Sequence, residues 1–198
     1  KQKTAYEIPK RDWSSDVCSS DLYAIVNHTR AVDVLVEHAR VDAKKLAVIG
    51  HSLGGHNSIF TALFDERVKA VVSSCGFDSF LDYYQEKQAA VWKPGQAWGQ
   101  DRYMPRISAY AGRLAEIPFD FHELAGALAP RAFLAVSPKG DANFKWRSAG
   151  RVVDAARPVY ALLGAPDRIA IEHPDCEHDF PPAMRERAYA WLERHLAP

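Results

Sequence analysis

The sequence predicts an α/β fold in which a parallel sheet of about four strands carries helices on both faces. Two observations indicate this class: short apolar runs typical of buried strands, and amphipathic stretches of helical period that separate them. The apolar runs are LAVIG (46–50), VKAVVSSCG (68–76), AFLAVSP (132–138) and RIAIEHP (168–174). Strands buried on both faces have nearly continuous apolar sequences, and their alternation with helices favours a parallel sheet.

Four stretches have the spacing of amphipathic helices. The first extends from about Tyr23 to Arg40, and the second spans residues 53–64. The third, Ser148–Leu163, contains Pro158, which donates no backbone hydrogen bond and is expected to interrupt or kink the helix. The last begins at residues 181–182, two prolines that a helix start tolerates. The expected apolar stripes are Ile25, Thr29, Val32, Leu35 and Val36; Ile59, Phe60, Leu63 and Phe64; and Met184, Ala188, Trp191 and Leu192.

The stretch between Phe77 and Pro130 is too long for a simple connection between parallel strands. It is predicted to form an insertion or cap, at about residues 77–130, over the carboxyl end of the sheet. Its aromatic residues are Tyr83, Tyr84, Trp92, Trp98, Tyr103 and Tyr110. They are expected to pack the cap, with stacking against a sugar ring as the alternative.

Residues 1–22 differ from the rest of the chain because they show no sustained apolar period and lack the apolar core of a signal peptide. Back-translated, Asp12–Leu22 and Lys1–Ile8 resemble the two ends of the index-side adapter of sequencing libraries. Residues 9–11 then hold the variable index. Residues 1–22 are therefore expected to be a translated adapter, with a disordered tail or linker as the alternative. Residues 23–198 are expected to be the C-terminal part of one domain.

The composition is that of a soluble globular protein. The 198 residues are 47% hydrophobic, and 25 Lys and Arg balance 25 Asp and Glu. This balance argues against nucleic-acid partners and a basic membrane-binding face. No apolar run approaches the roughly 18 residues that a membrane-spanning helix needs. The three cysteines have the spacing of neither a metal site nor a disulfide framework, so free thiols are expected.

The motif Gly50-His51-Ser52-Leu53-Gly54-Gly55 lies where the strand 46–50 meets the helix that starts at residue 53. A G-x-S-x-G sequence in this context predicts a nucleophile elbow, which lifts Ser52 above the carboxyl edge of the sheet. The glycines are expected because a tight turn leaves no room for side chains. The backbone N–H of Leu53 is the expected oxyanion donor. The alternative is a Gly/Ser turn that merely caps a helix.

A serine nucleophile needs a base and an acid that orients the base, and in this arrangement the chain order is Ser, acid, His. Asp141 follows the third expected strand and His178 follows the fourth, so both lie at the carboxyl edge of the sheet. The sequence therefore predicts Ser52, Asp141 and His178 as the catalytic residues. No metal or cofactor is expected.

Other residues near these positions compete for the same roles. Asp78, after the second strand, is the rival acid, whereas Asp175 and Asp179 flank His178 too closely to orient it. His173 is expected to be structural, His51 and His56 to be satisfied or partly buried histidines, and Cys75 to be inert packing. A metal site formed by His173, Asp175, Cys176 and His178 matches no standard zinc spacing.

With these residues in view, the chain resembles the α/β-hydrolase superfamily, and within it the dienelactone-hydrolase and acetylxylan-esterase-like branch. The resemblance rests on GHSLGG (50–55), SPKGDANF (137–144) and HPDCEHDFPPAMRERAYAWL (173–192). It implies that Ser52 attacks the ester carbonyl of a small or sugar-linked substrate, that His178 transfers the proton, that Asp141 fixes the imidazole tautomer, and that water hydrolyses an acyl-enzyme.

The resemblance also implies a truncated α/β-hydrolase fold, because the superfamily's first four strands precede the elbow and have no counterpart here. A second oxyanion donor normally comes from that half, and losing one donor costs about 100- to 1,000-fold in rate. The strand at 46–50 is then an exposed apolar edge that favours aggregation. The chain by itself is expected to be poorly soluble and nearly inactive. Two alternative functions are a prolyl-oligopeptidase-type serine peptidase and a non-catalytic binding protein on the same fold.

Overall fold

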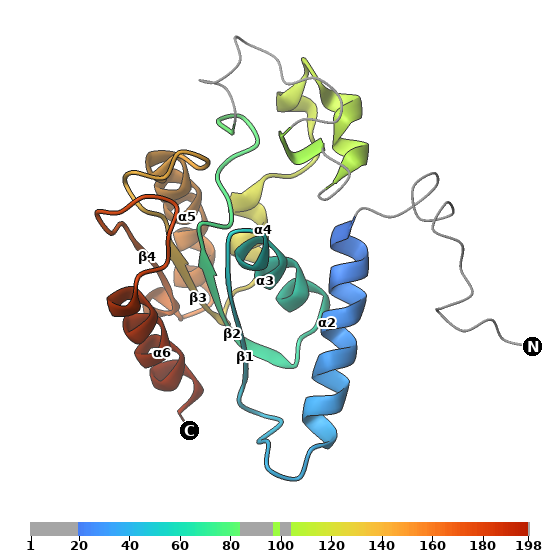
Figure 1. Cartoon of the computed structure of the whole chain (residues 1–198), viewed down its shortest axis with the longest axis vertical. Helices are drawn as coiled ribbons and strands as arrows, with labels where there is room; N and C mark the ends of the chain where they lie inside the picture. Colours follow the sequence, from blue (N-terminus) through green and yellow to red (C-terminus); the bar gives the residue numbers. More distant parts are fainter. Residues whose placement is uncertain (1–19, 84–96, 100–103, 198) are drawn as a thin grey trace, which may run out of the picture.

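The computed structural model describes residues 20–83, 97–99 and 104–197, and it contains the predicted parallel sheet. The four strands are β1 (Leu46–His51), β2 (Val68–Ser74), β3 (Ala132–Val136) and β4 (Ile169–Glu172). They lie side by side in the order β1-β2-β3-β4, so each strand pairs with the next one along the chain (Figure 1). The prediction of an α/β fold with a four-stranded parallel sheet is confirmed.

Side chains alternate between the two faces of this sheet, and each face is covered by different helices. Val71 and Phe133 belong to the large core cluster, which includes residues of α3 (Leu53–Phe64) and α5 (Trp146–Leu162). Their chain neighbours, Val72 and Leu134, point to the other face and pack against α6 (Pro182–Leu196). Figure 1 shows α6 on the opposite side of the sheet from α3. Full burial of each such side chain contributes about 1.5–3 kcal/mol, which explains why the strand sequences are almost continuously apolar.

The helices begin and end close to the predicted positions, with two differences in detail. The first helix, α2 (Ser20–Glu37), packs on α3 through buried Ile25 and Val32. Phe64, expected on the inner face of α3, is 69% exposed because it is the last residue of that helix. Pro158 lies inside α5 without interrupting it. In the closing helix α6, Met184 and Ala188 are buried as expected.

The stretch from Phe77 to Pro130 contains short elements rather than one long helix. They are the 3₁₀ helices η2 (Ala97–Gly99), η3 (Pro105–Tyr110) and η4 (Leu114–Glu116), followed by α4 (Phe121–Ala127). Asp120 caps α4, because its carboxylate accepts the N–H of Phe121 while Glu123 accepts the N–H of Asp120. α4 packs against α5 and α3, which anchors the end of this stretch to the sheet.

Two of the aromatic residues predicted in this stretch are buried. Trp98 is 0% exposed and Tyr83 is 5% exposed, and their rings lie 4.8 Å apart. Both also contact Phe144, which lies near the predicted catalytic acid in the sequence. These two rings therefore pack the interior, as expected. Tyr84, Trp92 and Tyr103 lie outside the described residues, and so do residues 1–19, on which the adapter interpretation mainly depends.

Candidate active site

Ser52 occupies a sharp turn between β1 and α3. Its backbone has φ 55° and ψ −120°, a positive-φ conformation that is sparsely populated by residues with a Cβ atom and costs about 1–3 kcal/mol. The Ser52 N–H donates to the carbonyl oxygen of Ser74 at 2.8 Å, so the turn is still bonded to β2. Strain held by surrounding hydrogen bonds is typical of a functional position. The predicted nucleophile elbow is present.

The glycines of the motif have different roles. A Cβ atom on Gly50 would lie 2.1 Å from the carbonyl oxygen of Gly54, and one on Gly55 would lie 2.6 Å from that of Ser74. A Cβ atom on Gly54 would meet nothing within 4 Å. The expectation that the turn has no room for side chains is therefore right for Gly50 and wrong for Gly54. The second indispensable glycine is Gly55, where α3 passes over β2.

His178 and Asp141 lie beside Ser52, although 126 and 37 residues separate the bonded pairs along the chain. His178 Nε2 lies 2.9 Å from Ser52 Oγ, and His178 Nδ1 lies 2.9 Å from Asp141 Oδ2. Because an ionised carboxylate only accepts hydrogen bonds, Nδ1 carries the proton and Nε2 is left to accept the serine O–H. The three residues thus form one chain of hydrogen bonds that leads from hydroxyl to carboxylate.

The Asp141 carboxylate is held from two sides. Its side chain is fully buried, whereas that of His178 is 24% exposed. Asp141 Oδ1 accepts the backbone N–H groups of Asn143 at 2.7 Å and Phe144 at 3.2 Å, which leaves Oδ2 for the imidazole. The loop after β3 therefore fixes the orientation of the carboxylate, and the carboxylate fixes the orientation of the ring.

The N-terminus of α3 faces the same edge of the sheet. Leu53 is the first residue of this helix, so its N–H has no partner within the helix. The N–H of His56, by contrast, already has a partner, because it donates to the carbonyl oxygen of Ser52 at 3.0 Å. The geometry is compatible with the predicted oxyanion donor at Leu53.

The rival acid Asp78 bonds to a different segment of the chain from His178. It is 0% exposed, and its Oδ2 accepts the backbone N–H of Lys145 at 2.9 Å. Burial raises the pKa of this carboxyl well above its usual range. Among the hydrogen bonds of the described residues, His178 bonds to Asp141 and not to Asp78. Asp78 instead ties the end of the loop that carries Asp141 to the segment after β2.

The other histidines have the structural surroundings that the sequence suggested. His173 Nδ1 lies 2.8 Å from the carbonyl oxygen of Ser137, and the buried ring of His56 stacks 4.6 Å from Trp98. The His51 ring centroid lies 5.0 Å from that of His178, and His51 Nδ1 is 3.3 Å from Ser74 Oγ. Burial, followed by the nearby His178, lowers the pKa of His51.

Cys75 is buried and unreactive, as expected, but its place beside the predicted acid and base is a feature that the sequence reasoning did not name. It is 1% exposed, as packing requires, yet its sulfur, an Asp141 carboxylate oxygen and a His178 ring nitrogen all lie within 4.8 Å of one another. Burial, then the charge of Asp141, raises the pKa of the thiol to about 12, so it is neutral and is neither nucleophile nor thiolate ligand at ordinary pH. Its position directly after β2, beside the strand that carries the elbow, was the available signal.

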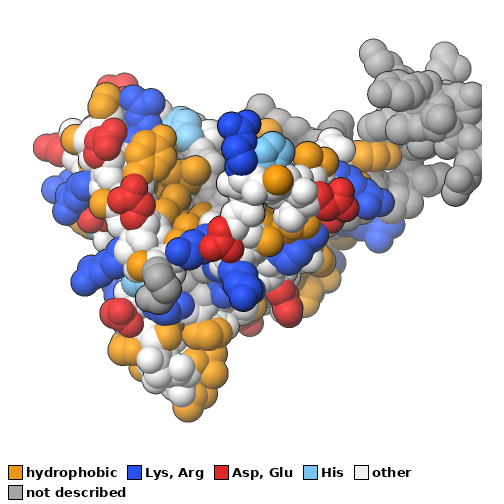
Figure 2. Space-filling view, turned by 90° about the horizontal axis from the view of Figure 1, so that it is seen from below, with side chains coloured by type: hydrophobic (Ala, Val, Ile, Leu, Met, Phe, Trp, Pro, Cys, Tyr) orange, Lys and Arg blue, Asp and Glu red, His pale blue; other side chains and the backbone are white. Residues whose placement is uncertain are grey.

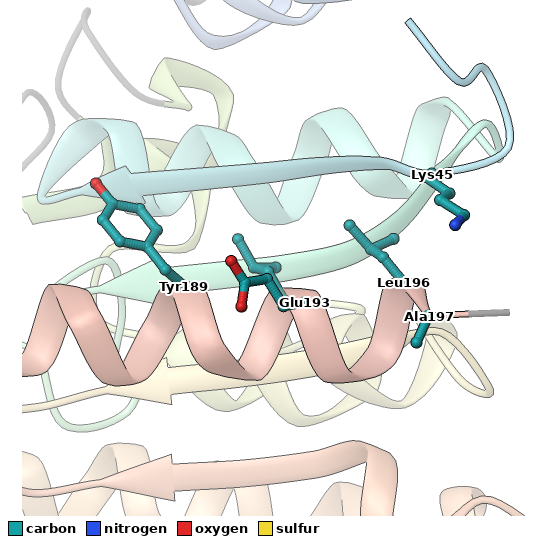
Figure 3. Close-up of a pocket in the computed structure, with 6 residues that line it drawn as sticks. Lys45, Tyr189, Glu193, Leu196 and Ala197 are labelled. Atoms are coloured by element: carbon teal, nitrogen blue, oxygen red, sulfur yellow. The ribbon is translucent and has the colours of Figure 1, made fainter.

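A groove beside α6 lies apart from the predicted site. That groove, of about 430 Å³, is lined by Lys45, which precedes β1, and by residues of α6, and Figure 3 shows Leu196 at the Lys45 end and Tyr189 at the other end. A second groove, of about 370 Å³, borders Asp141, Trp146 and Arg147. On the face shown in Figure 2, basic and acidic side chains are interspersed, in keeping with the neutral composition. None of the described helices is both long and apolar enough to span a bilayer.

Comparison with known proteins identifies related sequences and folds. A family model described as glucuronyl esterase of fungi matches residues 23–164. The 4-O-methyl-glucuronoyl methylesterase 1 of Wolfiporia cocos is 27% identical over 205 residues, which cover 93% of this chain and 48% of that protein. The chain spans about half the length, or less, of the curated relatives it matches.

Solved structures of the same group share the fold. A glucuronoyl esterase from Solibacter usitatus superposes with a TM-score of 0.76 at 22% identity, covering 99% of this chain and 53% of its own. A serine-to-alanine variant of the Sporotrichum thermophile glucuronoyl esterase, in complex with methyl 4-O-methyl-β-D-glucopyranuronate, gives a TM-score of 0.68 at 17% identity and covers 87% and 51%. The chain therefore has the α/β-hydrolase type of fold seen in these carbohydrate esterases.

Proposed function

The chain belongs to the glucuronyl esterase family, and on this premise we propose that the protein is a serine carboxylic-ester hydrolase that cleaves esters of uronic-acid sugars. The names of its relatives support the substrate class, because they are 4-O-methyl-glucuronoyl methylesterases. The single observation that carries the reaction type is the hydrogen-bonded chain Ser52–His178–Asp141, with 2.9 Å at each step.

In this mechanism, Ser52 Oγ attacks the ester carbonyl carbon while its proton passes to His178 Nε2. The Asp141 carboxylate stabilises the imidazolium that forms, and the backbone N–H of Leu53 donates to the developing oxyanion. The carbon–oxygen bond to the alcohol breaks when His178 returns its proton to the leaving oxygen, which produces an acyl-enzyme on Ser52. Water then attacks this ester with His178 again as base, releasing the uronic acid and restoring the serine hydroxyl.

Two experiments test this proposal. A fluorophosphonate probe should label Ser52 in the full-length enzyme, and the Ser52→Ala variant of that enzyme should not be labelled. As a matched control, Ser108→Ala should be labelled like the wild type, since the Ser108 hydroxyl donates to the carbonyl oxygen of Gly99 in a different segment. Hydrolysis of methyl 4-O-methyl-glucuronate should be lost in parallel with labelling. Absence of labelling in the folded wild-type protein would favour the non-catalytic alternative.

Substrate comparison separates the esterase from its enzymatic alternatives. Under our proposal, the glucuronate ester is cleaved with a higher kcat/KM than acetylated xylan or a proline-containing peptide ester. The narrower resemblance to dienelactone hydrolases and acetylxylan esterases predicts instead that the acetyl ester is the better substrate. Preference for cleavage after proline would support the prolyl-oligopeptidase-type alternative.

A further inference from the structure

The groove of about 370 Å³ beside the predicted active site, called the basic groove below, is lined mainly by basic side chains. Its four cationic residues come from the loop after β3 and from the start of α5: Lys139, Lys145, Arg147 and Arg151. The groove borders Asp141, but neither Ser52 nor His178 lines it. A substrate whose ester lies at Ser52 therefore reaches the basic groove only with a part that extends beyond the reacting sugar.

The two acidic residues that line the basic groove already have partners. The Arg151 guanidinium donates to the Asp82 carboxylate at 2.6 Å, and the buried Asp141 carboxylate lies 2.9 Å from the imidazole of the predicted base. Neither carboxylate is therefore left to neutralise Lys139 or Arg147. The acidic residues that flank the predicted base in the sequence do not line the groove. The basic groove thus has an excess of positive charge, which favours an anionic ligand.

The stability of α5 does not explain these cations. α5 begins at Trp146, its first turn contains no acidic residue, and the side chain of the preceding Lys145 makes no capping hydrogen bond. The N-terminus of a helix carries a partial positive charge, so the charges of Lys145 and Arg147 are unfavourable there. The guanidinium of Arg147 is nevertheless held in place, because it lies 4.4 Å from the centroid of the Trp146 ring. Cations that are positioned at a cost to the helix are expected where they bind an anion.

We propose that the basic groove is a subsite for the free carboxylate of a second uronic-acid unit on the same oligosaccharide or polysaccharide substrate. This inference rests on the proposed function, which supplies the substrate class, and it concerns a part of the substrate that does not react. The reacting uronic acid is esterified and therefore uncharged, so it has no electrostatic use for the groove. A free carboxylate fits the groove, because a guanidinium binds it through two parallel hydrogen bonds and a lysine adds a point charge. The side chains of Lys139 and Arg147 are exposed, so a polymer in solution can reach both.

The test compares two oligosaccharides that carry the same methyl 4-O-methyl-glucuronate ester, hydrolysed by the full-length enzyme. One also carries a free glucuronate, and in the other that carboxylate is reduced to the neutral alcohol. The measured quantity is the ratio of kcat/KM for the acidic and the neutral substrate, in which any general loss of activity cancels. The wild-type ratio should be about ten and arise from KM, because the contact is the same in the ground state and the transition state. Lys139→Met and Arg147→Met should each lower the ratio by about two- to fivefold, the scale of an exposed ion pair, and the double variant should bring it near one.

The control variant is Arg185→Met, because Arg185 is exposed on α6, on the opposite side of the sheet from α5. Its ratio should equal that of the wild type. Raising the salt concentration from about 0.02 to about 0.5 M should lower the wild-type ratio, since exposed charges are screened. A binding measurement that needs no turnover is calorimetric titration of the same two oligosaccharides into the full-length Ser52→Ala variant, with and without the Lys139→Met and Arg147→Met substitutions.

Tighter binding and a lower KM for the acidic oligosaccharide, lost in the double variant and kept in the control, support the subsite. Equal affinities for the acidic and the neutral oligosaccharide, or a double variant that still prefers the acidic one, would overturn the inference. Failure of the proposed function has a different signature: the wild-type enzyme then hydrolyses neither ester and is not labelled at Ser52. In that case the calorimetric titration still decides whether the basic groove binds the carboxylate.

Discussion

Replacement of Asp141 by asparagine tests which carboxylate orients the base. The asparagine side chain has one oxygen, and that oxygen is needed by the backbone N–H groups of Asn143 and Phe144, which Oδ1 accepts at 2.7 and 3.2 Å. The amide NH₂ then faces His178 Nδ1 at the 2.9 Å separation of the wild-type pair. Since an NH₂ group only donates, Nδ1 must become the acceptor and the imidazole proton moves to Nε2, which can no longer accept from Ser52.

The expected loss in kcat is about 10⁴-fold, the effect of the same change in a serine-protease triad, and it corresponds to about 5.5 kcal/mol of transition-state stabilisation. The assay is steady-state hydrolysis of a glucuronate ester by the full-length enzyme at neutral pH, with the unfolding transition recorded to show that the variant is folded. Asp78→Asn is the matched control: Asp78 is also buried, burial raises the pKa of its carboxyl, and asparagine retains an acceptor for the Lys145 N–H. A change of less than about tenfold is expected for the control. A larger loss in Asp78→Asn than in Asp141→Asn would refute our assignment of the acid.

Three further predictions concern stability. Gly50→Ala should lower the free energy of unfolding by about 3 kcal/mol, because the Cβ atom of the new alanine would lie 2.1 Å from a backbone oxygen. Gly54→Ala should change it by less than about 1 kcal/mol. Equal effects of the two variants in urea unfolding would contradict this interpretation of the turn. Arg131→Met should lower the free energy of unfolding by about 2–3 kcal/mol, because the guanidinium donates to the carbonyl oxygens of Ala62, Asp65 and Val68 at the end of α3 and the start of β2. The control is Arg113→Met, since Arg113 is exposed, and a loss of stability in Arg131→Met no greater than in the control would argue against this role. The lowered pKa of His51 means that the folded state binds fewer protons than the unfolded state below about pH 6.5, so stability is lost as the pH falls through that value. His51→Gln should make this loss less steep in unfolding curves recorded between pH 7 and pH 5, and parallel curves for the two proteins would contradict the expectation.

The sequence predicted the sheet and the three candidate catalytic residues because each depends on local patterns. Apolar runs located the four strands to within a few residues, and the carboxyl ends of parallel strands necessarily share one edge. That single geometric rule brought Ser52, Asp141 and His178 together from distant positions. By contrast, the packing of Phe64 was predicted incorrectly, because helical period alone does not show where a helix passes beyond the element it covers.

Two details of the site depend on close approach between segments, which has no signature in one sequence. Gly54 and Gly55 are adjacent and identical, yet only Gly55 lies against the backbone of β2. The choice between Asp78 and Asp141 likewise depends on which carboxylate lies within 2.9 Å of His178 and which one accepts Lys145. Both aspartates follow strands of the same sheet, so topology leaves both possible and the loop conformations decide.

The position of Cys75 shows how the strained edge of the sheet organises the site. Parallel strands end at one edge, but an ordinary β conformation would carry the chain onward and keep side chains on the two faces of the sheet. A left-handed residue at the end of β1 lifts the Ser52 hydroxyl to this edge, and one at the end of β2 turns the Cys75 sulfur toward the same place. Ser52 Oγ lies 2.9 Å from His178 Nε2, and the Cys75 sulfur lies within 4.8 Å of a His178 ring nitrogen and an Asp141 carboxylate oxygen.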